Sequence, residues 1–366
     1  GGNGFYCDGY EIMKLVSKKN NIECFGIPNC DNNLFGNDES IFIHPDWLLP
    51  QNNGIISRAG KVEESLWVIP TSSSRTVHVD GSGVYIKLHY PGVIGRLNRK
   101  LGFQELISGI EITSILEEAH HNNKLPAYFG YMPESYGRLF RDGQNEIGYI
   151  IRELPETIKD YYLVPGFSLF SYDRNVPDAP QLLKQIIERS NSPIEFFFED
   201  ICFKLIDIFF WCAFEEGLIP EMHSQNVVFA FNKEWEVEKI VLRDFESIDK
   251  DISIRRKLGK HTDFEENPNK CISSDDKNYL KRHSFMYDHK LGEYLLDPLI
   301  GCAAPLLHIN TIDIHKNLKN YVREVYGNII KNFFPADGCW YKYPNIEIDR
   351  STNERPFISM GSAVYR

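Results

Sequence analysis

The sequence has no closely spaced pair of cysteines, although eight cysteines occur among its 366 residues. Zinc knuckles and thioredoxin-type redox sites are built on Cys-x-x-Cys pairs, so neither kind of site is indicated. Two of the cysteines, Cys202 and Cys212, lie in an apolar helical stretch and are expected to pack as small hydrophobic residues. Unpaired thiols are typical of a reducing compartment, which predicts a cytoplasmic protein.

Long apolar runs and an excess of positive charge are also missing. No apolar stretch of about 18 residues and no signal sequence is visible, so we expect no membrane partner. The formal net charge is −11 at pH 7, whereas a nucleic-acid-binding surface needs clustered Lys and Arg, so no nucleic-acid partner is expected. The length allows one large or two medium domains, and 42% hydrophobic residues suffice for a packed core.

The character of the sequence changes after Pro165, from short apolar runs between polar turns to long helical patterns. Strands are predicted at 41–43, 66–70, 75–79, 84–88, 127–131 and 146–152, with a short helix within 5–20 and a long one over 102–121. Helices are predicted at 181–190, 194–216, 275–284, 290–298 and 312–333. The predicted class is α+β with a β-rich lobe over 1–163, a helical lobe over 164–366, and a ligand cleft between them.

A β-hairpin is predicted in the second lobe between two polar clusters, Glu221-Met222-His223-Ser224-Gln225-Asn226 and Arg243-Asp244-Phe245-Glu246. Apolar residues alternate on both arms, and the turn falls at 232–235. With the turn centred near Trp235, Asn226 would lie opposite Asp244, with Cβ atoms about 5 Å apart. An amide oxygen and a carboxylate this close could share Mg²⁺, which usually keeps waters and binds substrate phosphates. The hairpin is therefore predicted to bind metal beside a nucleotide.

Side chains that suit phosphate are concentrated in the first lobe. They are Ser73, Ser74, Arg75 and Thr76 in one polar loop, Lys87 in the following hairpin, and then Arg99. The guanidinium of Arg75 can bind phosphate with two hydrogen bonds. Lys87 interrupts an apolar strand, where a buried ammonium needs a partner. Taken singly, a Ser-rich loop is more often an ordinary turn, and Arg99 is more often a solvated helix start.

His223 also has two readings. A lone histidine is more often structural than catalytic, and the cluster around it could be a polar strand end that is hydrogen-bonded to itself. The convergence of His223, Gln225, Asn226 and Asp244 on one place is harder to explain by packing, and it favours a functional site.

In their order along the chain, these pieces resemble the IucA/IucC-type siderophore synthetases, ligases that work without a nonribosomal peptide synthetase. The matching segments are Ile43-His44-Pro45-Asp46-Trp47, Pro70-Thr71-Ser72-Ser73-Ser74-Arg75-Thr76, Lys87, Arg99, Arg152-Glu153, Leu163-Val164-Pro165, Glu221-x-His223-x-Gln225-Asn226 and Arg243-Asp244-Phe245. The segment from Glu221 to Phe245 is the most specific part of this match.

The resemblance implies a fingers-like first lobe, a palm-like second lobe, and ATP with Mg²⁺ as cofactors. Cofactor-binding residues would be Ser73, Ser74, Arg75, Thr76, Lys87, Arg99, His223, Gln225 and Asn226; the metal ligands would be Asn226 and Asp244; the catalytic group would be His223, Lys87, Arg75 and Arg99. The implied reaction is adenylation of a carboxylic acid, followed by condensation with an amine or hydroxyl. Both substrates are small molecules, and family members are often homodimers.

The chain departs from the family at two points. It begins Gly1-Gly2-Asn3-Gly4 and has essentially none of the family's N-terminal thumb, so we expect a truncated protein or a compact member. It also has no second His-Pro-x-x-Lys-type segment, so citrate is not assumed as the acid. Arg138, Arg141 and Arg152 are candidates for a carboxylate pocket, or equally for surface ion pairs. FhuF-like iron–sulfur reductases, which are associated with this family, are set aside because paired cysteines are missing.

Two other functions remain open from the sequence. Protein kinases hold metal with an Asn and an Asp-Phe-Gly aspartate, which Asn226 and Asp244-Phe245-Glu246 imitate, with Lys87 as the strand lysine. The chain has neither a G-x-G-x-x-G loop nor a His-Arg-Asp catalytic loop, which weakens this reading. The other function is that of a non-catalytic homologue that binds nucleotide without turnover.

Overall fold

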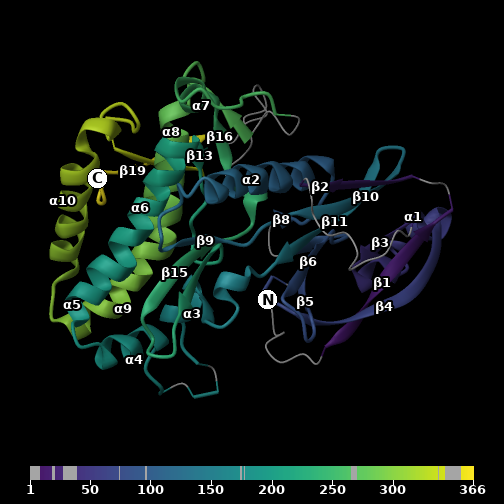
Figure 1. Cartoon of the computed structure of the whole chain (residues 1–366), viewed down its shortest axis with the longest axis horizontal. Helices are drawn as coiled ribbons and strands as arrows, with labels where there is room; N and C mark the ends of the chain where they lie inside the picture. The colour runs from purple at the N-terminus through teal and green to yellow at the C-terminus, as the bar shows by residue number, and fades with distance from the viewer. Residues whose placement is uncertain are drawn as a thin grey trace.

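The computed structural model describes residues 9–18, 21–27, 39–73, 75–94, 97–173, 175–176, 178–264, 270–336, 338–342 and 356–366. It is a mixed α+β structure in which a curved, nearly barrel-like sheet lies beside a helical C-terminal region (Figure 1). The predicted α+β class, with a β-rich first part and a helical second part, is therefore confirmed.

The curved sheet contains, within the described residues, eight strands in the order β2-β10-β11-β6-β5-β4-β1-β3, with every neighbouring pair antiparallel. They are β1 (Tyr10–Ser17), β2 (Ile22–Gly26), β3 (Ser40–Ile43), β4 (Gly60–Pro70), β5 (Thr76–Val79), β6 (Val84–Leu88), β10 (Tyr136–Asp142) and β11 (Asn145–Glu153). The sheet curls back on itself, because NH1 of Arg138 on β10 donates to the carbonyl oxygen of Ser40 on the far edge strand β3, 3.1 Å away.

The prediction of a short helix within 5–20 is wrong for the residues that the structure describes there, since Tyr10–Ser17 is strand β1. Ile12 and Leu15 are both fully buried, three residues apart. At the register shift between Ile12 and Met13 the extra residue lies on β4, so β1 itself stays regular. Ile12 and Leu15 therefore lie on opposite faces of β1, and burial on both faces gives its apolar residues a helix-like spacing.

A second sheet has the order β12-β14-β15-β9, in which β15 and β9 run parallel. Its strands are β9 (Phe129–Tyr131), β12 (Tyr162–Pro165), β14 (Val227–Phe231) and β15 (Val237–Leu242). Short strands complete the described structure: β7 (Val93–Ile94), β8 (Leu97–Asn98), β13 (Leu218–Ile219), β16 (Asp249–Asp251), β17 (Cys271–Ile272), β18 (Cys339–Lys342) and β19 (Phe357–Gly361). The predicted lobe boundary between residues 163 and 164 stays a prediction. Strand β12 extends across this boundary, and β9, which precedes it in the sequence, belongs to the second sheet.

Helix α2 (Phe103–His121) lies between the two parts, as Figure 1 shows. Leu106 and Ile110 pack with Leu139 and Ile150 of the curved sheet. One turn further on, Ile112 and Leu116 belong to the core of the helical part. The predicted helix over 102–121 is confirmed, and its side chains contribute to both cores.

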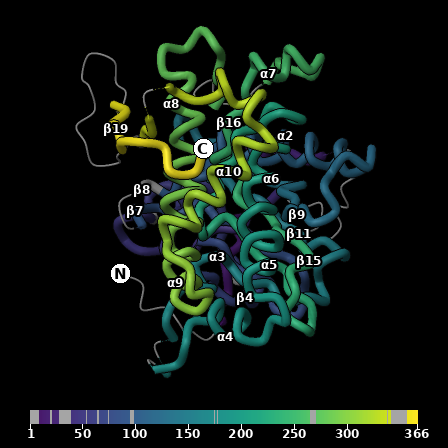
Figure 2. The backbone as a smooth tube through the Cα atoms, turned by 90° about the vertical axis from the view of Figure 1, so that its left-hand side faces the viewer, coloured from purple at the N-terminus to yellow at the C-terminus, as the bar shows by residue number. Residues whose placement is uncertain are grey.

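The helical region lies on the side of the molecule away from the curved sheet, with α9 and α10 prominent in Figure 2. Its helices are α3 (Gly166–Phe170), α4 (Leu182–Arg189), α5 (Pro193–Glu195), η4 (Phe196–Phe203), α6 (Lys204–Trp211), η5 (Cys212–Glu216), α7 (Ile252–Lys257), α8 (Tyr279–Ser284), η8 (Phe285–Leu296), α9 (Asp297–Leu307) and α10 (Thr311–Ile330). Shorter helical segments elsewhere are η2 (Pro45–Leu48), α1 (Asn53–Ala59), η3 (Glu156–Ile158) and η6 (Phe245–Ser247).

The aromatic stripe predicted in 194–216 forms core, since Phe209 and Phe210 are fully buried with ring centroids 5.0 and 5.1 Å from that of Tyr287. Cys202 and Cys212 are buried in the same core, as predicted. Among the described helices, none is individually long and apolar enough to cross a membrane; only Tyr279–Leu307 taken with Thr311–Ile330, a pair bent by 118°, passes by length and composition.

Candidate active site

The predicted hairpin is formed by β14 and β15, but its register differs by one residue from the prediction. The backbone NH of Arg243 donates to the carbonyl oxygen of Asn226, 3.1 Å away, so Asn226 lies opposite Arg243. The pairing is irregular between Ala230 and Phe231, near the turn, and this bulge moves one arm along by a residue. The expectation that Asn226 lies opposite Asp244 was therefore wrong.

Asp244 instead follows the end of β15 and leads into the short turn η6. Its backbone has φ 71° and ψ 64°, a left-handed conformation in which Asp is one of the better tolerated residues. Ser247 donates from its Oγ to the carbonyl oxygen of Asp244 at 3.0 Å, which closes the turn. The turn presents the carboxylates of Asp244 and Glu246 towards the curved sheet.

Lys87, on β6 of the curved sheet, is ion-paired with both of these carboxylates. Its Nζ contacts Oδ1 of Asp244 and lies 2.8 Å from Oε2 of Glu246. The Lys87 side chain is only 2% exposed, so the two carboxylates offset a charge that burial would otherwise destabilise. The expectation that Lys87 needs a partner is confirmed, and its partners come from the loop after the second-lobe hairpin.

Arg75 joins the same cluster from the start of β5. Its NH2 lies 3.1 Å from Oε1 of Glu246, and its NH1 donates to the carbonyl oxygens of Arg99 and Lys100 at 3.1 and 3.2 Å. The two oxygens of Glu246 therefore bind two different cations, Arg75 and Lys87. The guanidinium of Arg99, by contrast, forms no ion pair within the part of the chain that the structure describes, and its predicted role stays a prediction.

The loop before Arg75 is a tight polar turn. The backbone NH of Thr76 donates to Oγ of Ser73 at 3.0 Å, and Oγ1 of Thr71 donates to the carbonyl oxygen of Thr76 at 2.7 Å. Ser74 lies outside the described residues. This geometry is compatible both with an ordinary turn and with a phosphate-binding loop. In either case the turn places Arg75 beside Glu246.

Arg152, on β11, lies between two carboxylates. Its Nε donates to Oε1 of Glu134 and its NH2 to Oδ1 of Asp244, both at 2.6 Å. Of the three arginines considered for a carboxylate pocket, only Arg152 reaches the cluster. Arg138 donates within the curved sheet, and Arg141 pairs at the surface with Glu23 at 2.7 Å.

The cluster combines cations with an equal number of carboxylates: Arg75, Lys87 and Arg152 against Glu134, Asp244 and Glu246. Burial alone would raise the pKa of Asp244, but Lys87 and Arg152 outweigh it and hold that pKa well below its usual value. Asp244 is therefore ionised at neutral pH and available to a cation.

His223 lies at the mouth of the hairpin with a second, smaller set of charges. Its Nδ1 accepts the backbone NH of Gln225 at 3.2 Å, and its Nε2 is 3.8 Å from Oε2 of Glu221. The other oxygen of Glu221 is 2.6 Å from Nζ of Lys290. Burial lowers the pKa of His223 despite Glu221, which favours a neutral imidazole at pH 7.

Asn226 fits the predicted role of an oxygen ligand. Its Nδ2 donates to the carbonyl oxygen of Glu221 at 3.2 Å, so the amide oxygen is the atom available for a cation. Across the described residues, no group of three or more His, Cys, Asp or Glu side chains is placed to hold a metal. A cation at Asn226 and Asp244 would therefore take further oxygens from water or phosphate, as Mg²⁺ commonly does.

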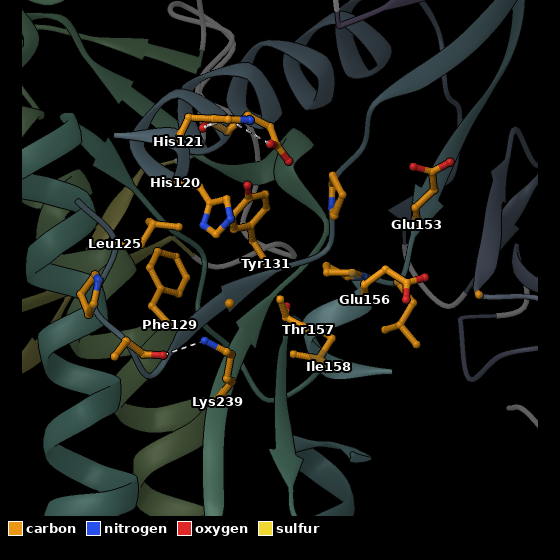
Figure 3. A pocket seen from close by; sticks show the side chains of 18 of the residues that line it. His120, His121, Leu125, Phe129, Tyr131, Glu153, Glu156, Thr157, Ile158 and Lys239 are labelled. Carbon is orange, nitrogen blue, oxygen red and sulfur yellow. Dashed lines mark hydrogen bonds and ion pairs between the residues drawn. The ribbon is translucent and has the colours of Figure 1, made fainter. Parts of the chain in front are cut away.

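A pocket of about 780 Å³ is lined by residues of α2, of the second sheet and of the segment from β11 to η3 (Figure 3). It is lined by Tyr131 and Lys239 on one side and by Glu153 on the other, and Lys239 donates to the carbonyl oxygen of Ala127 at 2.7 Å. None of the predicted ATP-site residues lines it. Glu153 follows Arg152 on a strand, and successive side chains point to opposite faces.

The fold matches solved siderophore synthetases. ATP-bound aerobactin synthetase IucA from a hypervirulent pathotype of Klebsiella pneumoniae has a TM-score of 0.69 at 15% identity, covering 86% of this chain and 61% of that one. The petrobactin biosynthesis protein AsbB from Bacillus anthracis strain Sterne gives 0.70 at 15% identity, covering 91% and 65%. Aerobactin synthetase IucC from the same Klebsiella pathotype gives 0.65 at 14%, covering 87% and 63%.

The chain thus has the fold of the synthetases that work without a nonribosomal peptide synthetase. The predicted resemblance to the IucA/IucC type is confirmed at this level, although the chain spans less than two thirds of the length of these structures. No curated protein matches the sequence.

Residues 195–330 match a family model described as ferric iron reductase FhuF-like transporter. This segment contains most of the helical part and the hairpin, so a likeness to the FhuF-like family is present without paired cysteines, and the exclusion of an iron–sulfur reductase stays a prediction. In the same segment, burial raises the pKa of the Cys202 and Cys212 thiols, which keeps them protonated and packed as core residues.

Proposed function

We propose that the chain is an ATP-dependent ligase of siderophore or related biosynthesis, which adenylates a carboxylic acid and joins it to an amine or hydroxyl. The observation that carries the proposal is the contact of Lys87 and Arg75 with the Asp244–Glu246 turn, in a fold shared with an ATP-bound aerobactin synthetase. The sequence predicted triphosphate binding for Lys87 and Arg75 and metal binding for Asp244, whereas Glu246 was not among the predicted site residues.

The reaction needs two steps, because a carboxylate does not condense with an amine at neutral pH. The substrate carboxylate attacks the α-phosphorus of ATP, which forms an acyl-adenylate and releases pyrophosphate. The amine or hydroxyl then attacks the acyl carbon, loses a proton, and expels AMP. In this scheme Arg75, Lys87 and Arg99 stabilise the charge of the departing pyrophosphate, and His223 and Gln225 contact the nucleotide.

Asn226 and Asp244 would hold Mg²⁺, which supplies further neutralisation of the phosphate charge when bound. Ser73, Thr76 and the predicted loop residue Ser74 would contribute hydroxyl groups to the same phosphates. The cytoplasm is the proposed location, and the described cysteines are free thiols, as a reducing compartment would require.

The test is pyrophosphate release from ATP, screened against a panel of carboxylic acids with and without an amine. Asp244→Asn should abolish release while the fold is retained. Asp200→Asn is the matched control, because Asp200 pairs with Lys204 at 2.8 Å on a distant helix and should leave the rate unchanged. Full pyrophosphate release by a folded Asp244→Asn protein would overturn the assignment.

Phosphoryl transfer is a second candidate, favoured by one observation. Lys87 on a strand of the first lobe pairs with Asp244 directly after the hairpin, and kinases likewise use a strand lysine and a metal-binding aspartate at their ATP site. The products separate the two reactions. A kinase releases ADP, whereas the proposed ligase releases AMP and pyrophosphate, and nucleotide binding with neither product would point to a non-catalytic homologue.

A further inference from the structure

Glu246 makes the contacts with Arg75 and Lys87 that the proposed function assigns to a phosphate group. Its Oε1 lies 3.1 Å from NH2 of Arg75, and its Oε2 lies 2.8 Å from Nζ of Lys87. Arg and Lys are the side chains that bind phosphate oxygens most strongly, and a carboxylate uses the same charge-assisted contacts. The two predicted phosphate-binding cations are therefore bound to an internal anion.

The cations are more deeply buried than the carboxylates that pair with them. The side chains of Arg75, Lys87 and Arg152 are 5%, 2% and 4% exposed, whereas those of Asp244 and Glu246 are 27% and 20% exposed. Oε2 of Glu246, the atom that contacts Lys87, is itself buried. An anion that binds Arg75 and Lys87 at the same atoms therefore has to displace Glu246.

The backbone of this turn is well held, so the movement falls to the Glu246 side chain. Phe245 is fully buried beside it, and Ser247 closes the turn onto Asp244. Release of Glu246 separates a carboxylate from both of its cations, which is unfavourable unless another cation replaces them. Free phosphate or pyrophosphate brings no such cation, whereas a nucleotide that carries a divalent cation does.

We propose that Glu246 is a specificity-determining residue, which reserves the phosphate position for a metal-bound triphosphate and excludes simple anions. The inference rests on the proposed function, because it assumes that Arg75 and Lys87 bind the triphosphate. Glu246 then competes with phosphate groups for Arg75 and Lys87. Once displaced, its carboxylate would bind the divalent cation, as Asp244 would.

The test compares ATP binding by calorimetry with Mg²⁺ and with EDTA, in the wild type and in Glu246→Gln. Glutamine has the same size but no charge, so metal-free ATP should bind the variant about tenfold more tightly, the effect of one charged hydrogen bond. The dissociation constant for ATP in EDTA, divided by that for ATP with Mg²⁺, should therefore be smaller in the variant than in the wild type. Inorganic pyrophosphate should also compete more strongly with ATP for the variant. Glu23→Gln, which removes a carboxylate paired with Arg141 at 2.7 Å, should keep the wild-type ratio.

If Glu246 had only a structural role, Glu246→Gln would lower the melting temperature and weaken the binding of ATP equally with Mg²⁺ and with EDTA. If Glu246→Gln binds ATP with an unchanged ratio, the inference is overturned and the proposed ligase stands. If the wild type does not bind ATP with Mg²⁺, the proposed function fails and the inference fails with it. Should Glu246→Gln not fold, Glu246→Asp keeps the charge but is too short to bridge both cations, and an unchanged ratio there also overturns the inference.

Discussion

Arg152 bridges Glu134 and Asp244, one carboxylate from the first lobe and one from the turn after the hairpin, with 2.6 Å hydrogen bonds to both. The Arg152 side chain is 4% exposed and that of Glu134 is 1% exposed. Arg152 therefore connects the buried interior of the curved sheet to the carboxylate that the proposed reaction requires, and Asp244 takes its position partly from Arg152.

Replacing Arg152 should lower the free energy of unfolding and also weaken the binding of nucleotide. Arg152→Gln leaves the Glu134 carboxylate buried without its main partner, and we expect a loss of about 3–5 kcal/mol in the free energy of unfolding, measured with urea. Arg141→Gln is the control, because Arg141 pairs at the surface and should cost at most about 1 kcal/mol. Equal losses in the two variants would show that the buried pair contributes no more than a surface pair.

Gly109 on α2 provides the space in which the Glu134 carboxylate lies. A Cβ at this position would fall on Oε2 of Glu134 and lie 3.0 Å from Cδ1 of Ile150. Gly109→Ala should therefore displace Glu134, lower the free energy of unfolding by about 1–3 kcal/mol, and weaken ATP binding through Arg152. Urea unfolding and calorimetry measure the two effects.

The matched variant for that prediction is Gly327→Ala on α10, where a Cβ would meet nothing within 4 Å. An alanine there should stabilise the helix by about 0.5–1 kcal/mol and leave ATP binding unchanged. A Gly109→Ala protein that behaves like Gly327→Ala would contradict the placement of Glu134.

Lys250 should make stability depend on pH. It is fully buried, with Nζ 3.4 Å from Oγ of Ser108 and 3.8 Å from Oε2 of Glu111, and burial lowers its pKa to about 7. The unfolded chain keeps this proton up to about pH 10, so between these values the unfolded state binds more protons than the folded one. Stability should therefore rise as pH increases from about 7 to 10, by up to about 1.4 kcal/mol per pH unit.

Melting curves between pH 6 and pH 10 test this dependence. Lys250→Met should raise the melting temperature at pH 6 and flatten the rise, because no charge is then buried. Lys316→Met removes an exposed lysine of α10 and should leave the slope as in the wild type. A slope that persists in Lys250→Met must come from other groups.

The sequence predicted those elements whose apolar pattern is regular. The hairpin 227–242 and the strands 75–79 and 84–88 follow the alternation of apolar residues that is typical of strands. Strand β1 was mistaken for a helix because both of its faces carry buried residues, so its apolar residues do not alternate with polar ones. Strand β10 was not predicted, since Tyr136–Phe140 are all buried, including the charged Arg138 in their middle, so the segment shows no apolar–polar alternation.

The candidate site was predicted in part for a related reason. Lys87 was singled out because a lysine in an apolar strand needs a partner, and its partners Asp244 and Glu246 stand in a polar cluster that the sequence shows. Glu134 gave no signal, since only the folded chain brings it to Arg152. A search for the carboxylates that pair with buried cations would have found Glu246. The burial of Arg75 and Lys87, however, is visible only in the structure.

Helix α2 contributes side chains to two hydrophobic cores, with Leu106 and Ile110 in one and Ile112 and Leu116 in the other. Pulling the two parts of the molecule apart would expose apolar surface along one side of this helix, so α2 resists hinge motion between them. Under the proposed function, admission of a nucleotide would then be a local event, in which side chains such as Glu246 and Lys87 exchange partners while the two cores around them stay in place.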